Sequence, residues 1–163
     1  MKYKQYEKAA KRHRATCDNL LKIVEDGFIG NKPIEQHEKD KMLENIYYLS
    51  GYVVECILSF KYFQLIKYNK NNSVYDFNDF KTYFSTHSKA PVIELIRERG
   101  GVKVNQIPIV GNIKLKQIEK DMYEHWKTKV RYTTIDLPFD VNLPNVFVFY
   151  SLCNKIYLTA RDL

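Results

Sequence analysis

The 163-residue sequence lacks the features that mark secreted, membrane-spanning and metal-binding chains. Its three cysteines, Cys17, Cys56 and Cys153, are widely spaced and contain no CxxC pair, so neither a disulfide framework nor a zinc site is predicted. Buried reduced thiols are the simplest account of them, and they predict a reducing compartment, the cytoplasm. No signal peptide is expected, because the basic N-terminal segment has no apolar region. The longest apolar stretch, 46–58, is interrupted by Glu55 and is too short to cross a bilayer, so no membrane association is expected.

Catalytic signatures are equally scarce. The sequence contains no P-loop, no GxGxxG, no HExxH and no Ser/His/Asp pattern, and this argues against the enzyme classes that these motifs mark. No Cys/His cluster has the spacing of metal ligands. The sequence therefore predicts neither a metal site nor a cofactor.

Basic and aromatic side chains are abundant instead. The net charge is +7 and the pI is about 9.2, which favours an anionic partner such as RNA, DNA or a nucleotide. A solvated basic surface without a partner is the alternative, because net charge alone specifies no ligand. Aromatic residues make up 14% of the chain, with 13 Tyr and 9 Phe, and such side chains are enriched at protein interfaces.

The apolar residues recur at the three- and four-residue steps of an α-helix over most of the chain. This period predicts four long helices and a shorter one; their ranges are 6–25, 39–68, 91–99, 113–127 and 144–160. The segment 75–84 is expected to form a short helix or an ordered loop. The segment 102–112 is expected to be a loop, with a small hairpin as the alternative.

The longest predicted helix, 39–68, carries apolar residues on two faces and should be the central element. Gly51 in its middle costs helix stability, so a close helix crossing is expected there. The predicted fold class is all-α: a helical bundle of about five main helices that forms a single domain over residues 1–163.

Three stretches occur together in a recognisable order. They are YYLSGYVVECIL at 47–58, Thr86-His87 ahead of IELI at 93–96, and WKTKVRY at 126–132. Together they resemble the HEPN domain family, whose members are helical bundles of bacterial defence and toxin–antitoxin systems. The resemblance spans roughly residues 6–160 and implies a HEPN-like fold. It also implies a homodimer, RNA or a nucleotide as ligand, and a partner such as a nucleotidyltransferase or another defence protein.

The sequence departs from the family at the catalytic motif. Ribonuclease members carry an Arg followed four to six residues later by a His near the last helix, whereas His125 here precedes Arg131. A metal-independent ribonuclease needs a base and a cation, and His125 and Arg131 are the only candidates for these roles. The alternative is that His125 is exposed and that Arg131 pairs with a carboxylate such as Glu55.

Glu55 lies in an apolar stretch, where a carboxylate costs free energy unless it is paired. It is expected to be largely buried, either in an ion pair with Arg131 or as a polar anchor at a groove or dimer seam. The basic run 11–14, with Lys4 and Lys8, forms a phosphate-facing stripe or a solvated helix face. The candidate ligand-binding residues are Glu55, Arg131, Tyr132, Arg12 and Arg14.

These observations favour a non-catalytic or accessory HEPN-like module that binds RNA, a nucleotide or a partner protein in a prokaryotic defence or toxin–antitoxin setting. Two alternatives stay open. One is a metal-independent endoribonuclease toxin with an unorthodox active site. The other is a purely structural interaction protein.

Overall fold

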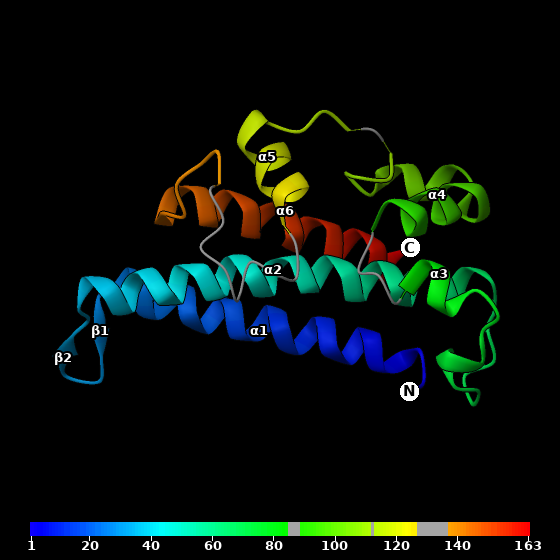
Figure 1. The fold of residues 1–163 in the computed structure, drawn as a ribbon, viewed down its shortest axis with the longest axis horizontal. Helices are drawn as coiled ribbons and strands as arrows, with labels where there is room; N and C mark the ends of the chain where they lie inside the picture. The colour runs from blue at the N-terminus through cyan, green and yellow to red at the C-terminus, as the bar shows by residue number, and fades with distance from the viewer. Residues whose placement is uncertain (85–88, 112, 127–136) are drawn as a thin grey trace.

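The computed structural model describes residues 1–84, 89–111, 113–126 and 137–163, and this part of the chain is mostly helical (Figure 1). The described elements confirm the all-α prediction, with one small two-stranded sheet beside the helices. In chain order they are α1 (Lys4–Asp26), β1 (Phe28–Ile29), β2 (Lys32–Pro33), α2 (Gln36–Leu65), the 3₁₀ helix η1 (Val74–Asp76), α3 (Phe80–Phe84), α4 (Lys89–Gly100), the 3₁₀ helix η2 (Val102–Gln106), α5 (Gln117–His125) and α6 (Leu143–Asp162).

Most helix ends lie within three residues of the predicted ends, and the start of α5 differs for a local reason. The helix α5 begins at Gln117 rather than at 113, because Glu119 accepts a hydrogen bond from the Lys116 N–H and caps the helix there (2.7 Å). A hairpin pairs Phe28 with Pro33, where only a loop was predicted. The alternative hairpin at 102–112 was wrong, since the 3₁₀ helix η2 occupies that segment.

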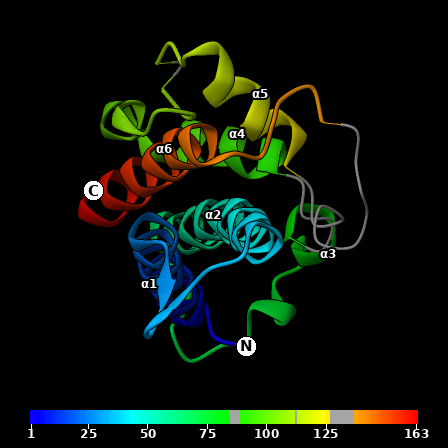
Figure 2. The ribbon, with the colours of Figure 1, turned by 90° about the vertical axis from the view of Figure 1, so that its left-hand side faces the viewer.

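The helix α2 is the central element, as predicted. Figures 1 and 2 show it between α1 on one side and α4, α5 and α6 on the other. From residue 56 to residue 63 every side chain of α2 is buried, so the helix is enclosed on all sides along this stretch. Neighbouring helices therefore cover both of its apolar faces, and little of its C-terminal half is left for a ligand.

A close helix crossing was expected at Gly51. The structure has a close contact there, but it is with a side chain and not with the backbone of another helix. A Cβ at this position would lie 1.9 Å from Cε2 of Trp126. The indole Nε1–H of Trp126 donates to the Tyr48 carbonyl at 2.9 Å. The Tyr47 hydroxyl donates to the Met122 carbonyl at 2.8 Å. These contacts hold the C-terminal end of α5 against the middle of α2.

Gly51→Ala is therefore expected to destabilise the protein, although alanine is the better helix former. The added methyl group overlaps the indole ring, and such overpacking costs about 1–3 kcal/mol. Urea denaturation measures the change, and emission from Trp126, the only tryptophan, reports on its surroundings.

A double-mutant cycle with Trp126→Ala gives the control. Once the indole is gone, Gly51→Ala meets no neighbour there, and its effect is expected to reverse to a gain of up to about 1 kcal/mol from helix propensity. An equal loss in both backgrounds would contradict the proposed contact.

Candidate nucleic-acid interface

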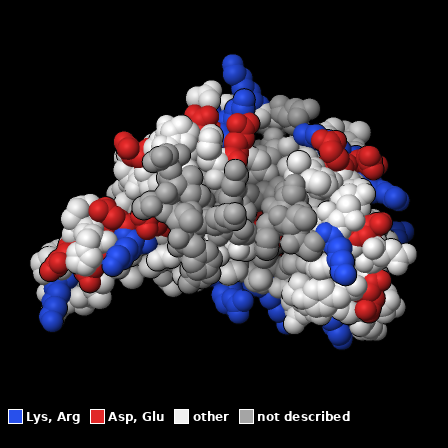
Figure 3. Space-filling model, in the orientation of Figure 1, with Lys and Arg blue, Asp and Glu red and all other residues white. Residues whose placement is uncertain are grey.

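The outer face of α1 carries a row of cations. Lys4, Lys8, Lys11 and Arg12 are spaced at helical steps, are all exposed, and lie on one side of the helix; we call them the α1 stripe. None of the four forms an ion pair with another described residue. In Figure 3 basic side chains project along the lower edge of the molecule, where Figure 1 places α1. The stripe therefore presents uncompensated positive charge to solvent over about 12 Å of helix.

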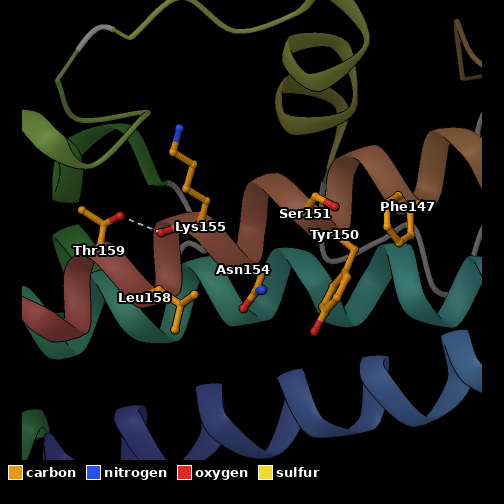
Figure 4. A pocket seen from close by; sticks show the side chains of 7 residues that line it. All are labelled: Phe147, Tyr150, Ser151, Asn154, Lys155, Leu158 and Thr159. Carbon is orange, nitrogen blue, oxygen red and sulfur yellow. Dashed lines mark hydrogen bonds between the residues drawn. The ribbon is translucent and has the colours of Figure 1, made fainter.

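Arg14 does not join the α1 stripe, although it is two residues from Arg12. Its side chain is half-buried, and its guanidinium carbon lies 5.2 Å from the centroid of the Tyr157 ring in α6. In the same seam the Tyr150 hydroxyl donates to the carboxylate of Asp18 in α1. Figure 4 shows Tyr150 pointing from α6 toward α1. Arg14 therefore packs α1 against α6, and the structure separates it from Arg12.

Glu55 is half-buried on α2, not fully enclosed as expected. Burial raises the pKa of the neighbouring Cys56 thiol to about 12. The Glu55 carboxylate raises this pKa further by a smaller amount, and the Arg12 guanidinium lowers it. Both charges therefore act on this buried thiol of α2. The expected partner Arg131 and the candidate Tyr132 lie outside the described residues, so the predicted Glu55–Arg131 pair stays a prediction.

His125 ends α5 and is half-buried rather than exposed. Its Nδ1 lies 2.8 Å from the Asp121 carbonyl, which can only accept, so this nitrogen is the donor. The imidazole also meets the Phe139 ring edge-on, with centroids 6.1 Å apart. The His125–Arg131 active site cannot be assembled from the described residues, since only His125 is among them.

The other histidines are placed separately. His13 is half-buried and packs on the Tyr52 ring with centroids 5.8 Å apart, and burial followed by the nearby Arg12 charge lowers its pKa. His37 is exposed beside Glu35 at 3.3 Å. His87, which belongs to the HEPN resemblance, lies outside the described residues.

The three cysteines are buried and form no disulfide bond, in agreement with the expectation of buried reduced thiols. Burial also raises the pKa of Cys17 to about 12. Within the described ranges no cluster of His, Cys, Asp and Glu side chains could hold a metal ion. The helices of that same part of the chain include none with the length and apolarity needed to cross a membrane.

Burial raises the pKa of five tyrosines, Tyr6, Tyr47, Tyr62, Tyr123 and Tyr150, and the hydrogen bond to Asp18 adds to the effect at Tyr150. Folding favours the protonated phenol, so this stability is fully present below pH 10, the unfolded pKa, and is lost as the pH rises further. The free energy of unfolding should fall by up to about 1.4 kcal/mol per pH unit for each such tyrosine.

Urea denaturation at a series of pH values from neutral to about pH 12 measures this loss. Tyr150→Phe should make the free energy of unfolding fall less steeply with rising pH, because this variant lacks one of the phenols whose ionisation is coupled to unfolding. A stability that stays constant through this range would contradict the assignment.

No protein-family model, curated protein or solved structure matches this chain. The α1 stripe is the strongest ligand-facing arrangement among the residues singled out from the sequence. What the chain binds must therefore be argued from this geometry and from the charge of the surface.

Proposed function

We propose that this chain is a non-catalytic, HEPN-like helical module that binds RNA through the α1 stripe, in a prokaryotic defence or toxin–antitoxin setting. The observation that carries the proposal is the α1 stripe itself, with four exposed cations that lack ion-pair partners among the described residues. Phosphate groups supply the missing negative charge, and the release of their counterions drives binding.

The shape of the surface favours RNA over a nucleotide. A mononucleotide gains affinity from a concave site that encloses most of its surface. The α1 stripe lies on the outer side of a helix, so it suits an extended chain of phosphates that contacts several cations in turn. His13 and Tyr52 pack together beside the stripe and are both half-buried, so their rings offer only edges for base contacts.

The variant Lys8→Glu, Lys11→Glu should bind a labelled single-stranded RNA at least about tenfold more weakly at physiological salt. Each phosphate contact on a single strand contributes about 0.7 to the slope of log affinity against log salt. The loss of two contacts should therefore lower that slope by about 1.4. Fluorescence polarisation over a range of salt concentrations measures both quantities.

The matched control is Lys32→Glu, Lys41→Glu, at two exposed lysines near the opposite end of α1. Both variants lower the net charge from +7 to +3, so equal losses would show that charge alone governs binding. Cleavage of the RNA without metal, abolished by His125→Ala, would instead favour the ribonuclease alternative. Wild-type protein that does not bind RNA at low salt would refute the proposal.

We further propose that the chain forms a symmetric homodimer through the outer face of α6. A shallow hollow of about 490 Å³ lies on this face, and Phe147 at its edge is 49% exposed (Figure 4). Tyr150, Asn154 and Leu158 also line the hollow. A helix face with an exposed aromatic anchor beside polar groups has the composition of an interface core.

Light scattering at micromolar concentration should give a mass near twice 19.4 kDa for the wild type. Phe147→Glu places a charge on this face and should yield the monomer. Val102→Glu is the control, because Val102 is also an exposed apolar residue, 85% exposed, but lies on η2. A wild-type mass of 19.4 kDa would rule the dimer out.

A further inference from the structure

A second basic surface lies far from the α1 stripe, where residues 107–111 and 113–116 lie beside α5 and α6. It surrounds a hollow of about 300 Å³, which we call the lysine-rimmed hollow. Its apolar wall is formed by Pro108, Ile113, Leu115 and Leu152. Its rim carries Lys114, Lys116 and Lys155. In Figure 4 the side chain of Lys155, which also lines the hollow beside Phe147, points away from α1.

The wall of the hollow is held in place before any ligand arrives. Arg97 of α4 donates from Nε to the Val110 carbonyl at 2.6 Å and from Nη2 to the Ile109 carbonyl at 3.3 Å. Gly111 lies so close to η2 that a Cβ there would be 1.7 Å from the Asn105 carbonyl oxygen. A preformed wall reduces the ordering cost that binding would otherwise carry.

Positive charge is in excess at this site. Among the described residues Glu119 is the one carboxylate that lines the hollow, and its Oε2 already accepts a hydrogen bond from the Lys116 backbone N–H at 2.7 Å. None of the three lysines forms an ion pair with another described residue. In the adjoining hollow, by contrast, Nζ of Lys120 lies 3.9 Å from Oε1 of Glu124, so the positive charge of Lys120 is compensated.

We propose that the lysine-rimmed hollow binds an acidic segment of a partner protein that also carries an apolar anchor residue. The apolar wall accepts the anchor, and the three lysines face the acidic side chains on either side of it. The hollow is open and lies at the small end of the range for ligand pockets, so a free small molecule would keep much of its surface in water. None of the described residues that line it is aromatic, so this part of the chain offers no stacking contacts of the kind that single-stranded RNA uses.

A display selection of random peptides against the purified protein tests the proposal, because it does not require the partner to be chosen in advance. Enriched peptides should combine Asp or Glu with Leu, Ile or Phe. They should bind Lys114→Glu, Lys116→Glu at least about tenfold more weakly in fluorescence polarisation. Ile113→Ser leaves the charge unchanged and should weaken binding about threefold or more, because it removes part of the exposed apolar wall.

Two controls separate this site from the other proposed surfaces. Lys32→Glu, Lys41→Glu matches the change in charge and should leave peptide binding unchanged, as should Lys8→Glu, Lys11→Glu in the α1 stripe. Circular dichroism melts confirm that each variant is folded. The proposal is overturned if no peptide is enriched, or if enriched peptides bind the Lys114/Lys116 variant as well as the wild type. It is also overturned if Lys8→Glu, Lys11→Glu abolishes peptide binding, or if RNA binding depends on Lys114 and Lys116.

Discussion

The contact between Trp126 and Gly51 is the constraint on which the arrangement of the later helices depends. The indole reaches the middle of α2 only because position 51 has no Cβ. The hydrogen bonds from Trp126 to the Tyr48 carbonyl and from Tyr47 to the Met122 carbonyl then fix how α5 lies on α2. Because α5 follows directly on residues 113–116, this contact adds to the Arg97 hydrogen bonds and the close approach of Gly111 that hold the wall of the lysine-rimmed hollow.

Cations of the same kind have three different roles in this fold. The α1 stripe is solvated, Arg14 packs on Tyr157, and Lys61 is only 2% exposed, with its Nζ donating to Gln64 Oε1 at 3.1 Å. Burial, followed by repulsion from Lys103, lowers the pKa of Lys61, so its charge is the most costly of the three. The net charge of +7 therefore overstates the positive charge that a ligand can reach, and the position of each cation matters more than the sum.

Apolar periodicity was sufficient to predict the all-α class and the central place of α2, because each depends on spacing within a helix. The mid-helix glycine predicted a close helix crossing at Gly51, where the structure instead has the Trp126 side chain. Helical spacing could also have predicted that the side chains of Arg14 and Arg12 lie on different faces of α1. Arg14 is four residues from the buried Ala10, whereas two residues along a helix turn a side chain to nearly the opposite side. The hairpin at 28–33 and the lysine-rimmed hollow could not have been found this way. Two-residue strands have no period, and the hollow joins residues near 113 with residues near 152.

The two basic surfaces differ in what accompanies the charge, and this difference argues for two kinds of ligand. The α1 stripe has exposed cations on a convex helix face, so its attraction is electrostatic and falls steeply with salt. The lysine-rimmed hollow adds an apolar wall whose contribution persists when charges are screened beyond about 8 Å. In Figures 1 and 2, α1 and α5 lie on opposite sides of α2, so a ligand on one surface does not obstruct the other. The two proposed ligands, RNA and a partner protein, would therefore not compete for one surface.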